Sequence, residues 1–266
     1  MNRSEKLART SLSLSLIGLG LVSIIYRNFA SNWQPVPASV PARSALASLS
    51  GAIMLLTGAG LLWQRTEALA SRVLFVYLAI WLVALQLPVV LKAPLVEVSW
   101  LGAGEIAVIA TAGWVLVRRD LRIARFAVGV ALIPIGLSHF VYPTATIGFV
   151  PSWLPFRAFW AYLGGAGHLA AAIGVLLGFC VVLAVRLEAA MIGAFTVLVW
   201  LPGVVRAPTS RQAWTAFLMS WMIGAGAWVV AEALARKWPT ERAIHVPDDV
   251  RITSRPYAPG IDRPVA

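Results

Sequence analysis

A segment of 22 residues occurs twice in this chain, at positions 41–62 and 155–176, with an offset of 114 residues. The two copies read PARSALASLSGAIMLLTGAGLL and PFRAFWAYLGGAGHLAAAIGVL, and nine of the 22 positions are identical. The same offset aligns KAP at 92–94 with RAP at 206–208, and Trp114 with Trp228. Upstream, residues 16–26 align with 132–142 at an offset larger by two. A constant offset over most of a chain indicates duplication, so the two halves are predicted to share one fold.

The composition allows only a membrane protein. Hydrophobic residues make up 59% of the 266 positions and charged residues 12%, which is too few to cover the surface of a water-soluble domain. Eight apolar runs, four in each half, lie at 10–26, 44–63, 73–88, 99–117, 126–141, 158–182, 190–201 and 213–231. The run at 190–201 is short for a span, and it is counted because it aligns with 73–88. The predicted fold class is all-α, a polytopic membrane protein with eight transmembrane helices.

Basic residues predict the orientation. With the N-terminus in the cytoplasm, sixteen Lys and Arg lie inside and six outside. Because each half has an even number of spans, the two four-helix repeats are parallel. We therefore expect a multi-pass protein of the bacterial cytoplasmic (inner) membrane with both termini cytoplasmic. The predicted units are a first repeat at 1–120, a second at 121–236 and a polar, proline-bearing disordered tail at 237–266.

The net charge of +11 follows from this topology, because the basic residues flank the spans instead of forming one face. Membrane lipids with anionic headgroups are the expected partners, and nucleic acid is not. Cys180 is the single cysteine, which excludes an internal dithiol or a cysteine metal cluster, and it is expected to pack in the sixth span. No metal site is predicted, because the histidines and acidic residues lack ligand spacing.

Three acidic or histidine residues fall inside predicted spans, where an unpaired charge is costly. Glu105 lies in the fourth span, His139 near the outer end of the fifth and His168 near the middle of the sixth. An imidazole can relay a proton, ligate a metal or hydrogen-bond a quinone carbonyl. Two interpretations stay open for each residue. It contacts a ligand, or it forms a hydrogen bond that only holds helices together.

Four further residues complete the set of candidate ligand contacts. Arg43 and Arg157 begin the second span of each half, directly after proline-rich loops, where they suit an anionic or carbonyl-bearing ligand or else reach lipid headgroups. Tyr142 and Tyr162 lie in the predicted outer half of the membrane. We expect a pocket open to the external side, with Glu105 from the first half and the histidines from the second. Near the inner interface, Glu232 and Arg236 are predicted to form an i,i+4 pair.

The second half carries a set of motifs: GLSHF at 136–140, FVPSWLP at 149–155, YLGGAGH at 162–168 and GVLLG at 174–178. Together they resemble the DoxX-like family of small four-helix membrane proteins, over about 110 residues from Arg122 to Ala235. The resemblance implies a four-helix fold and His139 and Arg157 as ligand contacts. Members of that family often have an acidic residue where this chain has His168, so a role of that carboxylate does not transfer.

The resemblance also bears on function, since the family is similar to subunits associated with quinone-linked sulfur oxidation and membrane redox complexes. The first hypothesis is therefore that the protein is a quinone- or lipid-contacting accessory subunit of a membrane redox system, with subunits of that system as partners. The alternative is a small-solute transporter, a channel or a scaffold without a redox role. The residues specify no cofactor beyond compatibility with a quinone, and they complete no catalytic constellation that would make the chain an enzyme.

Overall fold

The computed structural model describes residues 2–118 and 120–238, and the regular structure of this part is helical throughout. Within it, eight helices are long and apolar enough to cross a membrane, which makes the chain a multi-pass membrane protein. These spans are α1 (Arg3–Ile25), α2 (Arg43–Leu62), Glu67–Lys92, α5 (Glu97–Val117), α6 (Leu121–Val141), α8 (Arg157–Leu177), Val181–Arg206 and α11 (Arg211–Ala235).

The third and seventh spans contain π-helical turns. The third consists of α3 (Glu67–Ile80), the turn η2 (Trp81–Gln86) and α4 (Leu87–Lys92). The seventh consists of α9 (Val181–Phe195), η3 (Thr196–Trp200) and α10 (Leu201–Arg206). In both, the turn precedes a Leu-Pro pair whose proline has no N–H to donate, so the helical hydrogen-bond pattern changes there.

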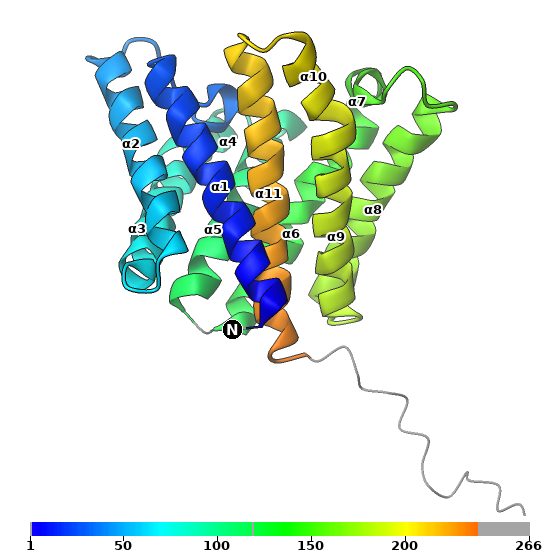
Figure 1. Ribbon diagram of the computed structural model, residues 1–266. Coiled ribbons are helices and arrows are strands. Elements are labelled where there is room, and N and C mark those ends of the chain that lie inside the picture. The colour runs from blue at the N-terminus through cyan, green and yellow to red at the C-terminus, as the bar shows by residue number, and fades with distance from the viewer. Residues whose placement is uncertain (1, 119, 239–266) are drawn as a thin grey trace, which may run out of the picture.

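The helices form one bundle with two faces (Figure 1). The face that carries the N-terminus and the connections α2–α3, α5–α6 and α8–α9 is called the terminal face. The opposite loop face carries longer connections, with η1 (Ser31–Trp33) after α1 and the short helix α7 (Pro143–Phe149) after α6. α5 packs against α11, while α1 packs against α2 and α11, and α6 packs against α5 and α8.

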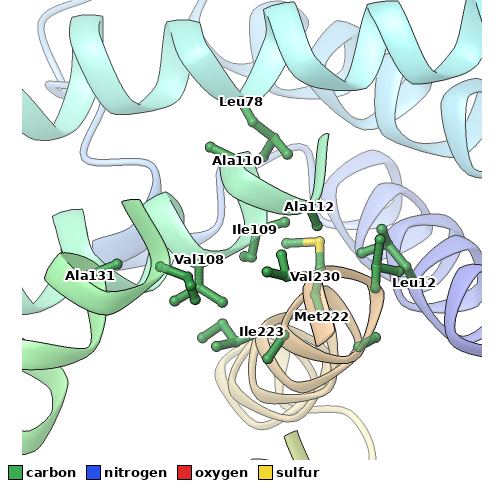
Figure 2. Packing of buried hydrophobic residues seen from close by; sticks show 14 of the residues in the cluster. Leu12, Leu78, Val108, Ile109, Ala110, Ala112, Ala131, Met222, Ile223 and Val230 are labelled. Atoms are coloured by element: carbon green, nitrogen blue, oxygen red, sulfur yellow. The ribbon is translucent and has the colours of Figure 1, made fainter. Parts of the chain in front are cut away.

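The core lies where α1, α5 and α11 meet. Leu12, Ile109 and Met222 are buried there, and Figure 2 shows their side chains together. In a bilayer, apolar side chains gain little by leaving lipid, so close helix packing depends on small residues. A Cβ atom on Gly51 would lie 2.7 Å from the carbonyl oxygen of Gly20, so only glycine allows this approach of α2 to α1.

Three expectations about local structure are wrong. α8 ends at Leu177 because Gly178 is left-handed (φ 79°), so Cys180 is exposed in the following connection and does not lie in the sixth span. The seventh span begins at Val181, nine residues before the predicted start at 190. Arg236 bonds to Glu5 (2.9 Å) instead of Glu232. Of the tail predicted to be disordered, residues 239–266 lie outside the described residues.

Candidate functional site

A cavity of about 640 Å³ lies among α5, α6, α7, α8, the seventh span and α11. Most of its wall is apolar. The polar residues of the wall are Trp33, Glu105, Ser138, His139, Tyr142, Thr146, Trp160, His168, Trp200 and Ser220. Residues of α7 and of the connection before α8 also line it, so the cavity extends toward the loop face. Four sequence-predicted candidates therefore share one cavity: Glu105 from the first half, and His139, Tyr142 and His168 from the second.

His139 is positioned by the glycine pair of α8. A Cβ atom on Gly165 would lie 2.6 Å from the Cβ of His139, and one on Gly164 would lie 3.3 Å from its Cε1. The absence of side chains at both glycines thus lets α6 and its imidazole approach α8. Nδ1 of His139 is 2.8 Å from the carbonyl oxygen of Ala161, one turn before Gly165. The ring centroids of His139 and His168 are 5.4 Å apart.

His168 pairs with Glu188 of α9. The distance between Nδ1 of His168 and Oε1 of Glu188 is 2.7 Å, and the two residues are 2% and 1% exposed. The second carboxylate oxygen, Oε2 of Glu188, is buried and has no hydrogen-bond partner among the described residues. A buried ion or carboxylic acid without water is stable only when it is paired, so the two residues must be regarded as one unit.

Glu105 faces the cavity and is held from the first half. The indole N–H of Trp33 donates to its Oε2 at 2.6 Å. Trp33 is itself anchored, because the side-chain amide of Gln86 in η2 donates to its carbonyl oxygen at 2.8 Å. The connection that contains η1 therefore folds inward and brings a hydrogen-bond donor to the buried side chain of Glu105.

The remaining candidates do not line this cavity. Arg157 donates from Nε to Val150 O (2.9 Å) and from Nη2 to Ile147 O (2.8 Å), which ties α8 to the end of α7. Arg43 donates to the Asn28 side chain at 2.7 Å and stabilises the first connection in the same way.

Tyr162 is 41% exposed and stacks on Phe140, on the outside of the bundle. Tyr142, in contrast, reaches the cavity wall, and its hydroxyl accepts the N–H of Val98 at 3.2 Å. The expected pocket therefore includes neither arginine nor Tyr162. Both arginines act on backbone carbonyl groups or a neighbouring side chain, a use of guanidinium that the sequence pattern does not distinguish from ligand binding.

Sequence reasoning missed Glu188 and Trp33. Glu188 was left outside the seventh span because that span was placed at the apolar run 190–201. A transmembrane helix needs roughly 20 residues, and this run is much shorter. A span extended to that length includes Glu188, so the length requirement is the sequence signal that could have identified this residue. For Trp33, no local sequence pattern indicates that its connection turns inward.

The first half has apolar residues where the second has the His168–Glu188 pair. At the 114-residue offset, His168 aligns with Met54 and Glu188 aligns with Leu74. Met54 and Leu74 are fully buried in α2 and α3, which pack against each other as α8 packs against α9. Helix packing of this kind therefore does not require a His–Glu pair, which favours a functional role for the pair over a purely structural one.

A metal ion is not suggested by the described side chains, since residues 2–118 and 120–238 contain no group of three His, Cys, Asp or Glu that could hold one.

Comparison with known proteins gives one match. Residues 128–213 match a family described as a domain of unknown function (DUF8561). The matched region runs from α6 to the start of α11 and includes His139, His168 and Glu188. No curated protein and no solved structure matches the chain.

The first-half residues provide a test of the pair. His168→Met alone leaves the Glu188 carboxyl group buried without its partner, and we expect it to lower the free energy of unfolding by about 3 kcal/mol. The double variant His168→Met/Glu188→Leu removes both polar groups, and we expect it to be at least as stable as the wild type. Unfolding in mixed detergent micelles measures both. A double variant as unstable as the single one would show that the pair is needed for packing.

Proposed function

We propose that this chain is a membrane protein that binds a lipophilic ligand of the quinone class in the cavity described above, as an accessory subunit of a membrane redox system. The observation that carries the proposal is a buried His168–Glu188 pair at the wall of a largely apolar cavity. The DoxX-like motifs of the second half favour the same class of ligand.

The dimensions and lining of the cavity support this ligand class. Small-molecule sites are commonly 300–1,000 Å³, mostly apolar and supplied with a few convergent polar groups. A volume of about 640 Å³ accommodates an aromatic ring with part of an apolar tail. Glu105, His139 and His168 come from three different helices, and all three side chains can form hydrogen bonds to the oxygen atoms of a ring.

We also propose that the two halves are parallel four-helix repeats, at 1–120 and 121–236. Matched local geometry supports this. Ala42 and Phe156, which precede α2 and α8, both have positive φ angles, of 51° and 54°. The side chains that follow them bond alike, because Arg43 donates from Nε to Val36 O and Arg157 donates from Nε to Val150 O. Each acceptor lies seven residues before its arginine.

The proposed location is the bacterial inner membrane, with the terminal face in the cytoplasm. A phosphatase that is active only outside the cytoplasm should be active when fused after Ala93 or Ala207, on the loop face. The same reporter should be inactive after Thr66 and at the C-terminus, because these positions lie inside. Activity of the C-terminal fusion would contradict either the orientation or the even number of spans.

Ligand binding is tested directly with the protein in lipid nanodiscs. We expect a decyl-tailed benzoquinone or its hydroquinone to raise the thermal midpoint of the wild type, because a ligand that binds only the folded state stabilises it. His139→Phe should reduce this shift several-fold, since it removes a polar group from the cavity wall. Tyr162→Phe, outside the cavity, should keep the shift of the wild type.

An unchanged midpoint with both redox forms would contradict the proposed ligand class. Uptake of a small solute into proteoliposomes by the same preparation would then support the alternative, a transporter or channel.

A further inference from the structure

The hydrogen-bonding character of the cavity wall can be derived from the partners of its ionisable groups. The first is His139, whose Nδ1 lies 2.8 Å from the carbonyl oxygen of Ala161. A carbonyl oxygen can only accept, so Nδ1 carries the proton of the neutral ring. Nε2 of His139 is then a lone-pair acceptor. Because His139 lines the cavity, a bound ligand meets an acceptor at this position.

The second group is His168, and the same reasoning applies. Its Nδ1 lies 2.7 Å from Oε1 of Glu188, and an ionised carboxylate has no proton to donate. With Glu188 as a carboxylate, the proton between them is carried by Nδ1, and Nε2 of the neutral ring is again an acceptor. A carboxylate that fixes the tautomer of a neighbouring imidazole in this way is a common arrangement at histidine-containing sites.

The third group is Glu105, whose Oε2 accepts from the indole N–H of Trp33. Two donor groups on the nearby wall already have acceptors in the protein. The hydroxyl of Ser138 donates to Ile135 O and the indole of Trp160 to Pro155 O. Tyr142 and Trp200 add donors to the wall, while both imidazole rings present Nε2 as an acceptor.

We infer that the cavity selects the hydroxyl-bearing, reduced form of its ligand, a hydroquinone, over the carbonyl-bearing quinone. A hydroquinone donates from its hydroxyl groups to Nε2 of His139 or His168. A quinone has only acceptor oxygens, which cannot pair with Nε2 of either histidine. The inference rests on the proposed function, and it specifies which redox form the same site recognises.

The expected selectivity is large. A buried site that offers acceptors loses those hydrogen bonds when the ligand cannot donate, and the cost of one such mismatch corresponds to roughly ten- to hundredfold in affinity. Shape contributes little to the difference, because the two redox forms have nearly the same size. Glu188 controls the selectivity through the tautomer of His168, so it is a positioning residue that does not itself have to touch the ligand.

The test compares three decyl-tailed probes that share one ring: the benzoquinone, its hydroquinone and the dimethyl ether of the hydroquinone. Equilibrium binding of tritium-labelled probes to the protein in nanodiscs, without oxygen, gives three dissociation constants. We expect the hydroquinone to bind at least about tenfold more tightly than the quinone or the ether. The ether matters because it keeps the reduced ring and removes only the donor hydrogens.

Glu188→Gln is the matched variant. Its amide can donate to Nδ1 of His168, which places the ring proton on Nε2 and turns that atom into a donor. We expect the preference for hydroquinone to fall to near one or to reverse. A loss of packing alone would weaken all three probes together and leave their ratio unchanged. Tyr162→Phe, on the outer surface, should retain the ratio of the wild type.

The outcomes separate the two proposals. If the wild type binds quinone and hydroquinone equally, the inference fails while the proposed ligand class stands. If it binds neither, both fail. An unchanged ratio in Glu188→Gln would overturn the role of the pair, and the wild-type ratio decides the selectivity even if this variant does not fold.

Discussion

The hydrogen bond between His168 and Glu188 is the interaction on which this account depends. Both residues lie at membrane depth, and both are almost completely buried. A charge in a membrane-spanning helix is stabilised by a polar partner, so each group requires the other. The inference for the cavity is that the carboxylate sets which ring nitrogen of His168 carries the proton. A ligand in the cavity thus meets the ring of His168, whose donor or acceptor character is set by Glu188.

The packing of the helices around His168 and Glu188 shapes the cavity. Glycines at 164 and 165 let α6 approach α8, and the π-helical turn η3 forms part of the cavity wall next to α11. In the first half, the connection after α1 folds inward, and Gln34 lies between α2 and α3, where its amide donates to Ser50 and Tyr77. In the second half, α7 leaves a cavity. Two halves with similar spans therefore differ in what fills the space beneath their loops.

The fold class was predictable because membrane insertion imposes strong constraints. Apolar runs, their bounding charges and the constant offset indicate eight helices, and even the weak run at 190–201 belongs to a complete span. Boundaries were less predictable. Cys180 was expected inside a helix, but a left-handed Gly178 ends α8 before it, and a single glycine among many small residues gives no clear stop signal.

The candidate site was predictable only in part. Ionisable residues such as Glu105 and His168 are conspicuous in an apolar sequence, since the free-energy cost of burying them in a membrane requires a polar partner. The partner itself was not predictable, because it depends on which helices pack together. Trp33 is 72 positions from Glu105 in the sequence. Glu188 lies outside the seventh span as predicted from the sequence, because that predicted span is too short. Arg157 illustrates the converse, because its position suits a ligand while its donors bind the backbone of α7.

The most direct measurement of the central claim is nitrogen-15 NMR of the His168 ring in lipid bilayers without ligand. The account predicts a proton on Nδ1, a bare Nε2 and a change in both resonances in Glu188→Gln. A bare Nδ1 with a protonated Nε2, or resonances that do not respond to Glu188→Gln, would contradict the claim that this carboxylate sets the chemistry of the cavity.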